Sequence, residues 1–155
     1  MKGLIKENHF EVRIRDIINT DIISVSNNFI MLNNQKGNDI LICRNGENPA
    51  LFFIEVKYYN KSHGRLGIGH GNGAGFQPEI LQKKVNYFEK NTRWILGNID
   101  DEFYYIATND EIRNYLSGGI IDYKQNNIQT KIFSEVKKLK RNELVNELLI
   151  FFNKL

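Results

Sequence analysis

Cysteine, proline and long apolar runs are scarce in this sequence, and each of these features argues against a particular class of protein. A single cysteine, Cys43, cannot form an intramolecular disulfide, so an oxidising compartment gains no support. No apolar run reaches the roughly 20 residues that a membrane span needs, and the opening Met-Lys-Gly-Leu-Ile-Lys-Glu places charge where a signal peptide needs an apolar stretch. We therefore expect a cytoplasmic protein.

The remaining composition is that of a soluble globular protein. The 155 residues are 41% hydrophobic and 25% charged, and they contain only two prolines, which indicates one ordered domain over residues 1–155. The formal charge of +3 and the pI of about 8.9 suit a protein that meets a polyanion, but proteins that never touch nucleic acid often share them. Net charge alone therefore decides no function.

Apolar periodicity and turn residues predict an alternation of helices and strands. We expect helices over Glu7–Asn19, from Pro78 to about Lys90, from a cap at Asn109 or Asp110 to Leu116, and over Asn142–Lys154. We expect strands or β-rich stretches over Ile22–Val25, Phe29–Leu32, Asp39–Arg44, Ala50–Tyr59, Trp94–Leu96, Phe103–Ala107 and Ile120–Phe133. This order predicts a mixed α/β or α+β domain.

The two strongest predicted strands form a hairpin that brings charged side chains together. If the turn is centred on Glu47, Arg44 faces Ala50 and Asp39 falls opposite Glu55. Lys57, two residues later, points to the same face as Glu55. The apolar neighbours on both faces of these strands predict that both faces are buried.

Two carboxylates opposite each other on paired strands create an electrostatic conflict. Their Cβ atoms would lie about 5 Å apart, where like charges repel and burial raises a carboxyl pKa. A divalent cation removes the conflict, and hard carboxylate oxygens completed by water and phosphate oxygens suit Mg²⁺. Lys57 could then orient or deprotonate a water, or neutralise charge on a phosphate; otherwise it pairs with Glu55 or extends to solvent from the strand.

At these residues the sequence resembles the PD-(D/E)XK nuclease superfamily. Gly37-Asn38-Asp39 on one strand and Ile54-Glu55-Val56-Lys57 on the next carry the resemblance, with Asn38 in place of the family's proline. The resemblance implies a restriction-endonuclease-like core, a central mixed sheet flanked by helices. It also implies that Asp39 and Glu55 bind Mg²⁺, for which Mn²⁺ substitutes, and that Lys57 assists the attacking water.

Many members of the superfamily add a glutamate from the preceding helix. Glu11 is our choice for that position because it lies in the middle of the predicted helix, and Glu7, one turn earlier, is the alternative. Either residue could instead be a solvated charge on a helix surface.

Within the superfamily, residues Gly37 to Ala107 resemble small type II restriction endonucleases in the order of their elements. The likeness implies double-strand cleavage of DNA at a short specific sequence by a homodimer, with a cognate DNA methyltransferase in the same system. The hairpin turn is longer than expected for that subgroup.

A polar, glycine-rich segment from Lys61 to Gln77 follows the Glu-x-Lys strand. Its backbone could approach phosphates, and residues of its types contact DNA in other proteins. We expect DNA contacts from this segment and from the start of the next helix, through His63, Arg65, His70, Asn72, Gln77, Lys83 and Lys84. The alternative is a plain surface loop, and the two histidines lack the partners of a zinc site.

Other functions remain open at this stage. A Holliday-junction resolvase or another structure-selective nuclease could carry the same Asp…Glu-x-Lys core. A non-catalytic DNA-binding module could keep a nuclease-like fold, although the intact trio of charged residues argues against it. A ribonuclease has no positive support, because nothing resembles an RNA-recognition motif.

Overall fold

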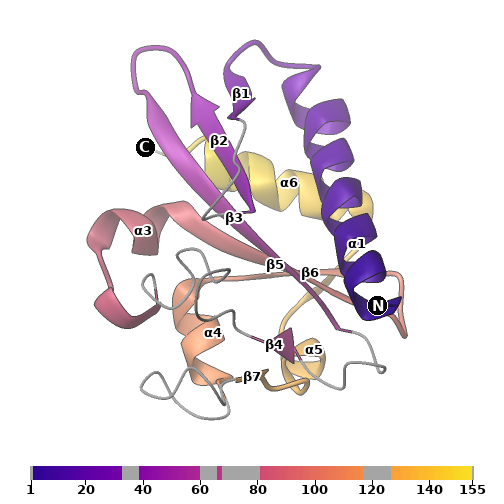
Figure 1. The fold of residues 1–155 in the computed structure, drawn as a ribbon. Coiled ribbons are helices and arrows are strands. Elements are labelled where there is room, and N and C mark those ends of the chain that lie inside the picture. The colour runs from indigo at the N-terminus through magenta and orange to yellow at the C-terminus, as the bar shows by residue number, and fades with distance from the viewer. Residues whose placement is uncertain (1, 33–38, 60–65, 68–80, 117–126, 155) are drawn as a thin grey trace.

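The computed structural model describes residues 2–32, 39–59, 66–67, 81–116 and 127–154, with the side chains of residues 2–8 left aside. Figure 1 shows their arrangement around one sheet. The helical elements are α1 (Lys2–Ile18), a π-helical turn η1 (Asn19–Ile23), α3 (Asn86–Asn91), α4 (Asn109–Asn114), α5 (Ile132–Glu135) and α6 (Arg141–Phe152). The strands are β1 (Phe29–Leu32), β2 (Ile40–Arg44), β3 (Ala50–Tyr59), β4 (Leu66–Gly67), β5 (Thr92–Asn98), β6 (Tyr104–Ala107), β7 (Asn127–Ile128) and β8 (Lys138–Leu139).

Six of these strands form a mixed sheet in the order β1-β2-β3-β5-β6-β8. Only the β3–β5 pair is parallel, while the other four neighbouring pairs are antiparallel. β4 and β7 form a separate antiparallel pair. The protein is therefore a mixed α+β fold, as the element order predicted, and its mixed sheet is flanked by helices.

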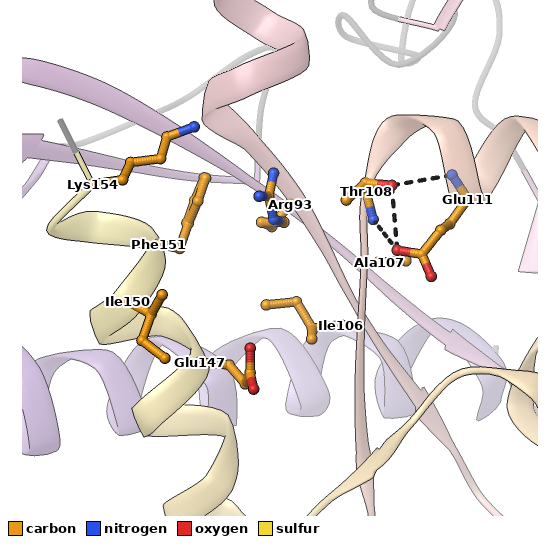
Figure 2. Close-up of a pocket in the computed structure, with 9 residues that line it drawn as sticks. All are labelled: Arg93, Ile106, Ala107, Thr108, Glu111, Glu147, Ile150, Phe151 and Lys154. Carbon is orange, nitrogen blue, oxygen red and sulfur yellow. Dashed lines mark hydrogen bonds between the residues drawn. The ribbon is translucent and has the colours of Figure 1, made fainter.

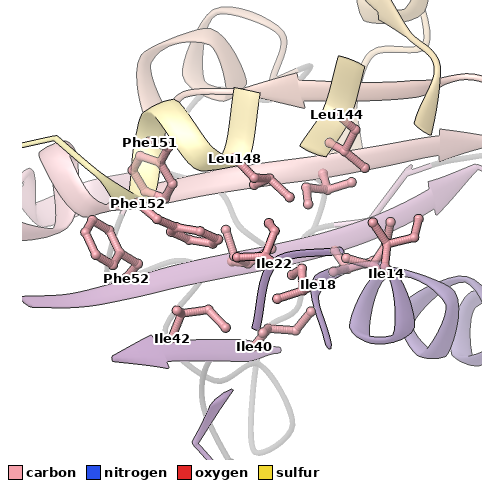
Figure 3. Packing of buried hydrophobic residues seen from close by; sticks show 14 of the residues in the cluster. Ile14, Ile18, Ile22, Ile40, Ile42, Phe52, Leu144, Leu148, Phe151 and Phe152 are labelled. Atoms are coloured by element: carbon pink, nitrogen blue, oxygen red, sulfur yellow. The ribbon is translucent and has the colours of Figure 1, made fainter. Parts of the chain in front are cut away.

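The first face of the sheet packs against α1 and α6. Apolar residues recur at helical spacing in both helices and meet the inward residues of β2 and β3. Figure 3 shows this packing for Ile14, Ile18, Ile22, Ile40, Ile42, Phe52, Leu144, Leu148, Phe151 and Phe152. Each fully buried side chain of this size contributes roughly 1.5 to 3 kcal/mol of hydrophobic free energy. Among the described residues, this layer is the larger of two hydrophobic clusters.

The second face carries a smaller core over β5 and β6. Its buried members are Leu66, Leu81, Trp94, Leu96, Tyr105, Ala107, Ile112, Leu116, Ile128, Ile132 and Phe133. In Figure 1, α4 and α5 lie next to β4 and β7, away from β1 and β2. In the part of the chain that the structure describes, no helix combines the length and apolar character needed to cross a membrane.

The hairpin between β2 and β3 has the predicted register. Arg44 pairs with Ala50, and Ile40 pairs with Ile54. Gly46 has a φ of +105°, a backbone conformation that glycine adopts without steric cost. The Asn45-Gly46 signal therefore marks the turn correctly.

The prediction that both faces of this hairpin are buried is only partly right. Phe52, Ile54 and Val56 are buried on the first face, whereas Leu51 on the second face is 38% exposed. On the second face, burial begins at Phe53, because its ring packs against that of Phe88 on α3, with 5.0 Å between the ring centroids.

One predicted strand near the start of the chain is wrong, and the β-rich stretch predicted over Ile120–Phe133 contains β7 but is wrong at its end. The segment predicted as a strand over Ile22–Val25 continues the first helix as the turn η1, because Ile22 completes the apolar stripe of α1 and packs in the same core. Phe133, predicted to lie in a β-rich stretch, belongs to α5. Its ring packs edge-on against that of Tyr105, which places a helix rather than a strand over β6.

The helix predicted from Pro78 to about Lys90 is interrupted. Its described part has a helical turn over Leu81–Lys83, then Lys84 with a φ of +50° and an extended Val85, before α3 begins. In an unbroken helix the Leu81 carbonyl would accept from the Val85 N–H. Here it accepts from Arg113 Nε at 2.7 Å, which compensates for the break.

Candidate active site

The Glu-x-Lys pair lies in the centre of the sheet. Glu55 is completely buried and Lys57 is 9% exposed, an unusual position for two charged side chains. Glu55 pairs with Trp94 and Lys57 with Leu96 on the parallel strand β5. Since paired residues point to the same side of a sheet, both charged groups share the face of the smaller core.

Asp39 lies immediately before β2, one residue beyond the Ile40–Ile54 pair. Its carboxylate Oδ2 accepts a hydrogen bond of 2.7 Å from the backbone N–H of Val56. Because Val56 follows Glu55 directly, the Asp39 carboxylate is held against β3 at the position that the register predicted. The side chain turns toward the β3 backbone, whereas strict alternation would point it out from the sheet beside the Glu55 side chain.

Glu11 on α1 approaches the same carboxylate. The pKa of Glu11 is raised above its ordinary value, first by burial and then by the negative charge of Asp39. Arg15 opposes both effects, since its Nε lies 3.7 Å from Glu11 Oε2. Arg15 also donates to the backbone carbonyl of Asp39, which ties α1 to the start of β2. The side chain of Glu7, the alternative, lies outside the described part of the structure.

The donor chemistry of this corner suits Mg²⁺. Glu11 and Asp39 are a close carboxylate pair on two elements, with Glu55 on the adjoining strand, and hard oxygen ligands are what Mg²⁺ prefers. Within the described residues, however, no three His, Cys, Asp or Glu side chains are grouped so that they could hold a metal ion. The carboxylates of Glu11 and Asp39 thus lie close together, and the third carboxylate, that of Glu55, is on β3.

Two of the seven predicted DNA contacts belong to the described part of the chain. His63, Arg65, His70, Asn72 and Gln77 lie outside the described residues. Lys83 and Lys84 are described, and both are exposed where the helix breaks before α3.

A buried polar network on the second face was missed by the sequence analysis. The Asn109 side chain is 1% exposed; its Oδ1 accepts from Trp94 Nε1 at 2.7 Å and its Nδ2 donates to Glu89 Oε2 at 2.6 Å. Arg113 donates to the other oxygen of the same Glu89 carboxylate. This network joins α3 and α4 to Trp94, the neighbour of Glu55.

The cap of α4 was also assigned to the wrong residue. Thr108, rather than Asn109 or Asp110, accepts from the Glu111 N–H, and the Glu111 carboxylate accepts in return from Thr108. The Thr-x-x-Glu spacing in the sequence is the signal for such a capping box.

Comparison of the chain with models of protein families, with curated proteins and with solved structures finds no significant match.

Proposed function

We propose that the protein is a Mg²⁺-dependent endonuclease that hydrolyses phosphodiester bonds in double-stranded DNA. One observation carries the proposal: the Asp39 carboxylate is bonded to β3 beside the buried Glu55 and close to Glu11. Carboxylates placed this close together cost stability unless a cation binds them, and a metal-dependent phosphodiesterase requires such oxygen ligands.

Each residue has a distinct part in the proposed reaction. Asp39 and Glu55 supply oxygen ligands, and Glu11 adds a further carboxylate from α1. A bound Mg²⁺ would make a coordinated water more acidic and stabilise charge on the phosphate. Lys57 would orient the attacking water or neutralise charge on the phosphate as the bond from phosphorus to the leaving oxygen breaks.

The proposal extends to the type II restriction class and its restriction-endonuclease-like core. Support comes from the order of elements: a helix with Glu11, the hairpin with Asp39 and Glu55, and a parallel strand beside it. A palindromic DNA site calls for two symmetric centres, so the proposed active form is a homodimer. A cytoplasmic location and a partner DNA methyltransferase belong to the same proposal.

The test is incubation of the purified protein with phage-sized duplex DNA in Mg²⁺, in Mn²⁺ and in EDTA, followed by separation of the products by length. Asp39→Asn serves as the inactive comparison. Discrete fragments that require metal and disappear with Asp39→Asn would support a sequence-specific endonuclease.

Other outcomes redirect or end the proposal. Intact duplex together with cleaved four-way junctions would replace restriction with structure-selective cleavage. DNA binding without any cleavage of either substrate would refute catalysis and leave a binding module. Equal cleavage by the wild type and Asp39→Asn would remove this corner as the active site.

A further inference from the structure

Four basic side chains meet where β3 and β5 begin and α6 ends. We call Arg44, Lys90, Arg93 and Lys154 the basic cluster. Arg44 ends β2, Lys90 lies in α3, Arg93 is the second residue of β5, and Lys154 follows α6. Three parts of the chain that are far apart in sequence therefore contribute the four cations.

The inner pair of the basic cluster is built around one aromatic ring. The Arg93 guanidinium lies 4.4 Å from the centroid of Phe151, and the Lys154 ammonium lies 5.3 Å from it. Figure 2 shows both side chains beside Phe151 at one end of a cavity. Arg93 Nη1 donates to the Thr92 carbonyl at 2.8 Å. Packing against Phe151 therefore holds the two cations in place.

Arg44 fixes the outer part of the cluster. Its Nη1 donates to the Phe152 carbonyl at 2.8 Å and to the Lys154 carbonyl at 2.5 Å, while its Nε donates to the Asn48 carbonyl at 2.8 Å. Lys154 Nζ in turn donates to the Lys90 carbonyl. Cations at the carboxyl end of a helix interact favourably with the helix dipole, which accounts for part of this arrangement. Every one of these acceptors is a neutral carbonyl, so none of the bonds neutralises a positive charge.

The cluster thus carries four positive charges, which the Glu111 carboxylate partly offsets at Arg93. None of its four members forms an ion pair with a carboxylate among the described residues. The pKa of Lys154 is lowered from its ordinary value, first by burial and then by the charges of Arg93, Lys90 and Arg44. Such repulsion is relieved when an anion binds.

Two cavities give an anion access to the cluster. One, of about 270 Å³, is lined by Arg93, Lys154 and Thr108 with apolar walls, and the other, of about 420 Å³, by Arg44, Lys90 and Lys154. Lys154 borders both. Carboxylates also line these cavities: Glu111, whose Oε1 accepts from Thr108, and Glu147 line the first, and Glu47 lines the second.

We propose that the basic cluster binds phosphate groups, supplied either by a nucleic-acid backbone or by a free polyphosphate. Arginine offers a planar fork for phosphate oxygens and lysine a compact charge, and adjacent cations favour a ligand with more than one negative charge. The site is separate from the candidate active site. Arg93 pairs with Ile54, the residue next to Glu55, but it lies on the first face of the sheet, whereas Glu55 lies on the second. Arg44 pairs with Ala50, which is about 17 Å from Glu55 along β3.

The experiment measures binding without metal, so it does not depend on cleavage. Affinity for a duplex of about 20 base pairs is measured in EDTA over a range of salt concentrations, for the wild type and for Arg93→Gln/Lys154→Gln. Removing two phosphate contacts should reduce the slope of log K against log salt by roughly 1.8. Lys131→Gln/Lys137→Gln, with the same charge change at exposed positions elsewhere, is the matched control and should keep the wild-type slope.

A calorimetric titration with inorganic pyrophosphate distinguishes the two sources. Pyrophosphate binding that is lost in the cluster variant, with an unchanged DNA slope, assigns the site to a free polyphosphate. If neither ligand responds to the cluster variant, or the control loses as much as the cluster variant, the inference is overturned, even where the wild type cleaves DNA normally. Should the Arg93 change unfold the protein, Lys90→Gln/Lys154→Gln carries the same test without disturbing β5.

Discussion

Asp39 offers the sharpest test, because two substitutions separate its two roles. Its Oδ2 accepts from the Val56 N–H at 2.7 Å, and its charge raises the pKa of Glu11. Asp39→Asn keeps a side-chain oxygen that can accept from Val56 but removes the negative charge. Asp39→Ala removes both.

The expected difference in stability follows from the hydrogen bond. Val56 is only 3% exposed, so its N–H has little access to water once Asp39 is truncated. Leaving such a donor unpaired costs about 1 to 3 kcal/mol. For a domain of this size that lowers the melting temperature of Asp39→Ala by roughly 2 to 12 °C. Asp39→Asn should stay within about 1 kcal/mol of the wild type, because it also relieves the repulsion of Glu11.

Thermal unfolding and Mg²⁺-dependent DNA cleavage are measured on both variants, with Asp16→Asn as the control for a charge change at an exposed position of α1. We expect both Asp39 variants to lose cleavage while only Asp39→Ala loses stability. If Asp39→Asn melts as early as Asp39→Ala, the bond to Val56 is not what stabilises this corner. If Asp39→Asn cuts DNA at the normal rate, Asp39 is not a metal ligand.

Three further predictions concern single positions. Lys57→Met should slow DNA cleavage strongly while metal binding, followed by calorimetry, is retained; a normal rate would exclude Lys57 from the reaction. Because the folded pKa of Glu11 lies above its ordinary 4.5, the stability that its protonated form contributes is present below that value and lost as pH rises through the folded pKa. Glu11→Gln should therefore raise the melting temperature near neutral pH but not well below pH 4.5, and an equal gain at both would contradict the assigned cause. Gly97→Ala would place a Cβ 2.6 Å from the Phe10 ring and should lower the free energy of unfolding, measured in urea, by about 1 to 3 kcal/mol. Unchanged stability would show that α1 can move to accommodate the added methyl group.

Local signals predicted the elements that position the candidate site. The Asn45-Gly46 turn fixes the hairpin register, and that register alone brings Asp39 to the level of Glu55. The apolar stripes of the first and last helices place α1 and α6 on one face of the sheet. Each of these features depends on residues close together in sequence or on a simple period, which is why a single sequence was enough.

Other features depend on contacts between distant residues, which no local pattern contains. The helix break at Lys84 is compensated by Arg113, 32 residues beyond the Leu81 carbonyl that it binds. The short helix that holds Phe133 is fixed by its packing on Tyr105. The basic cluster is the extreme case, because each of its four cations looks like an ordinary surface charge in its own segment.

The direction of the Asp39 side chain is the most instructive difference between expectation and structure. Alternation along a strand predicts a carboxylate beside that of Glu55, but Asp39 precedes the first paired residue of β2, so the sheet does not fix its side chain. The carboxylate binds the Val56 N–H instead, and this brings it toward Glu11 on α1. The result is a carboxylate pair that costs stability, next to a glutamate buried within the sheet. Arrangements that cost stability are found mainly at functional sites of proteins. A divalent cation bound between these carboxylates would replace their repulsion with attraction to the metal.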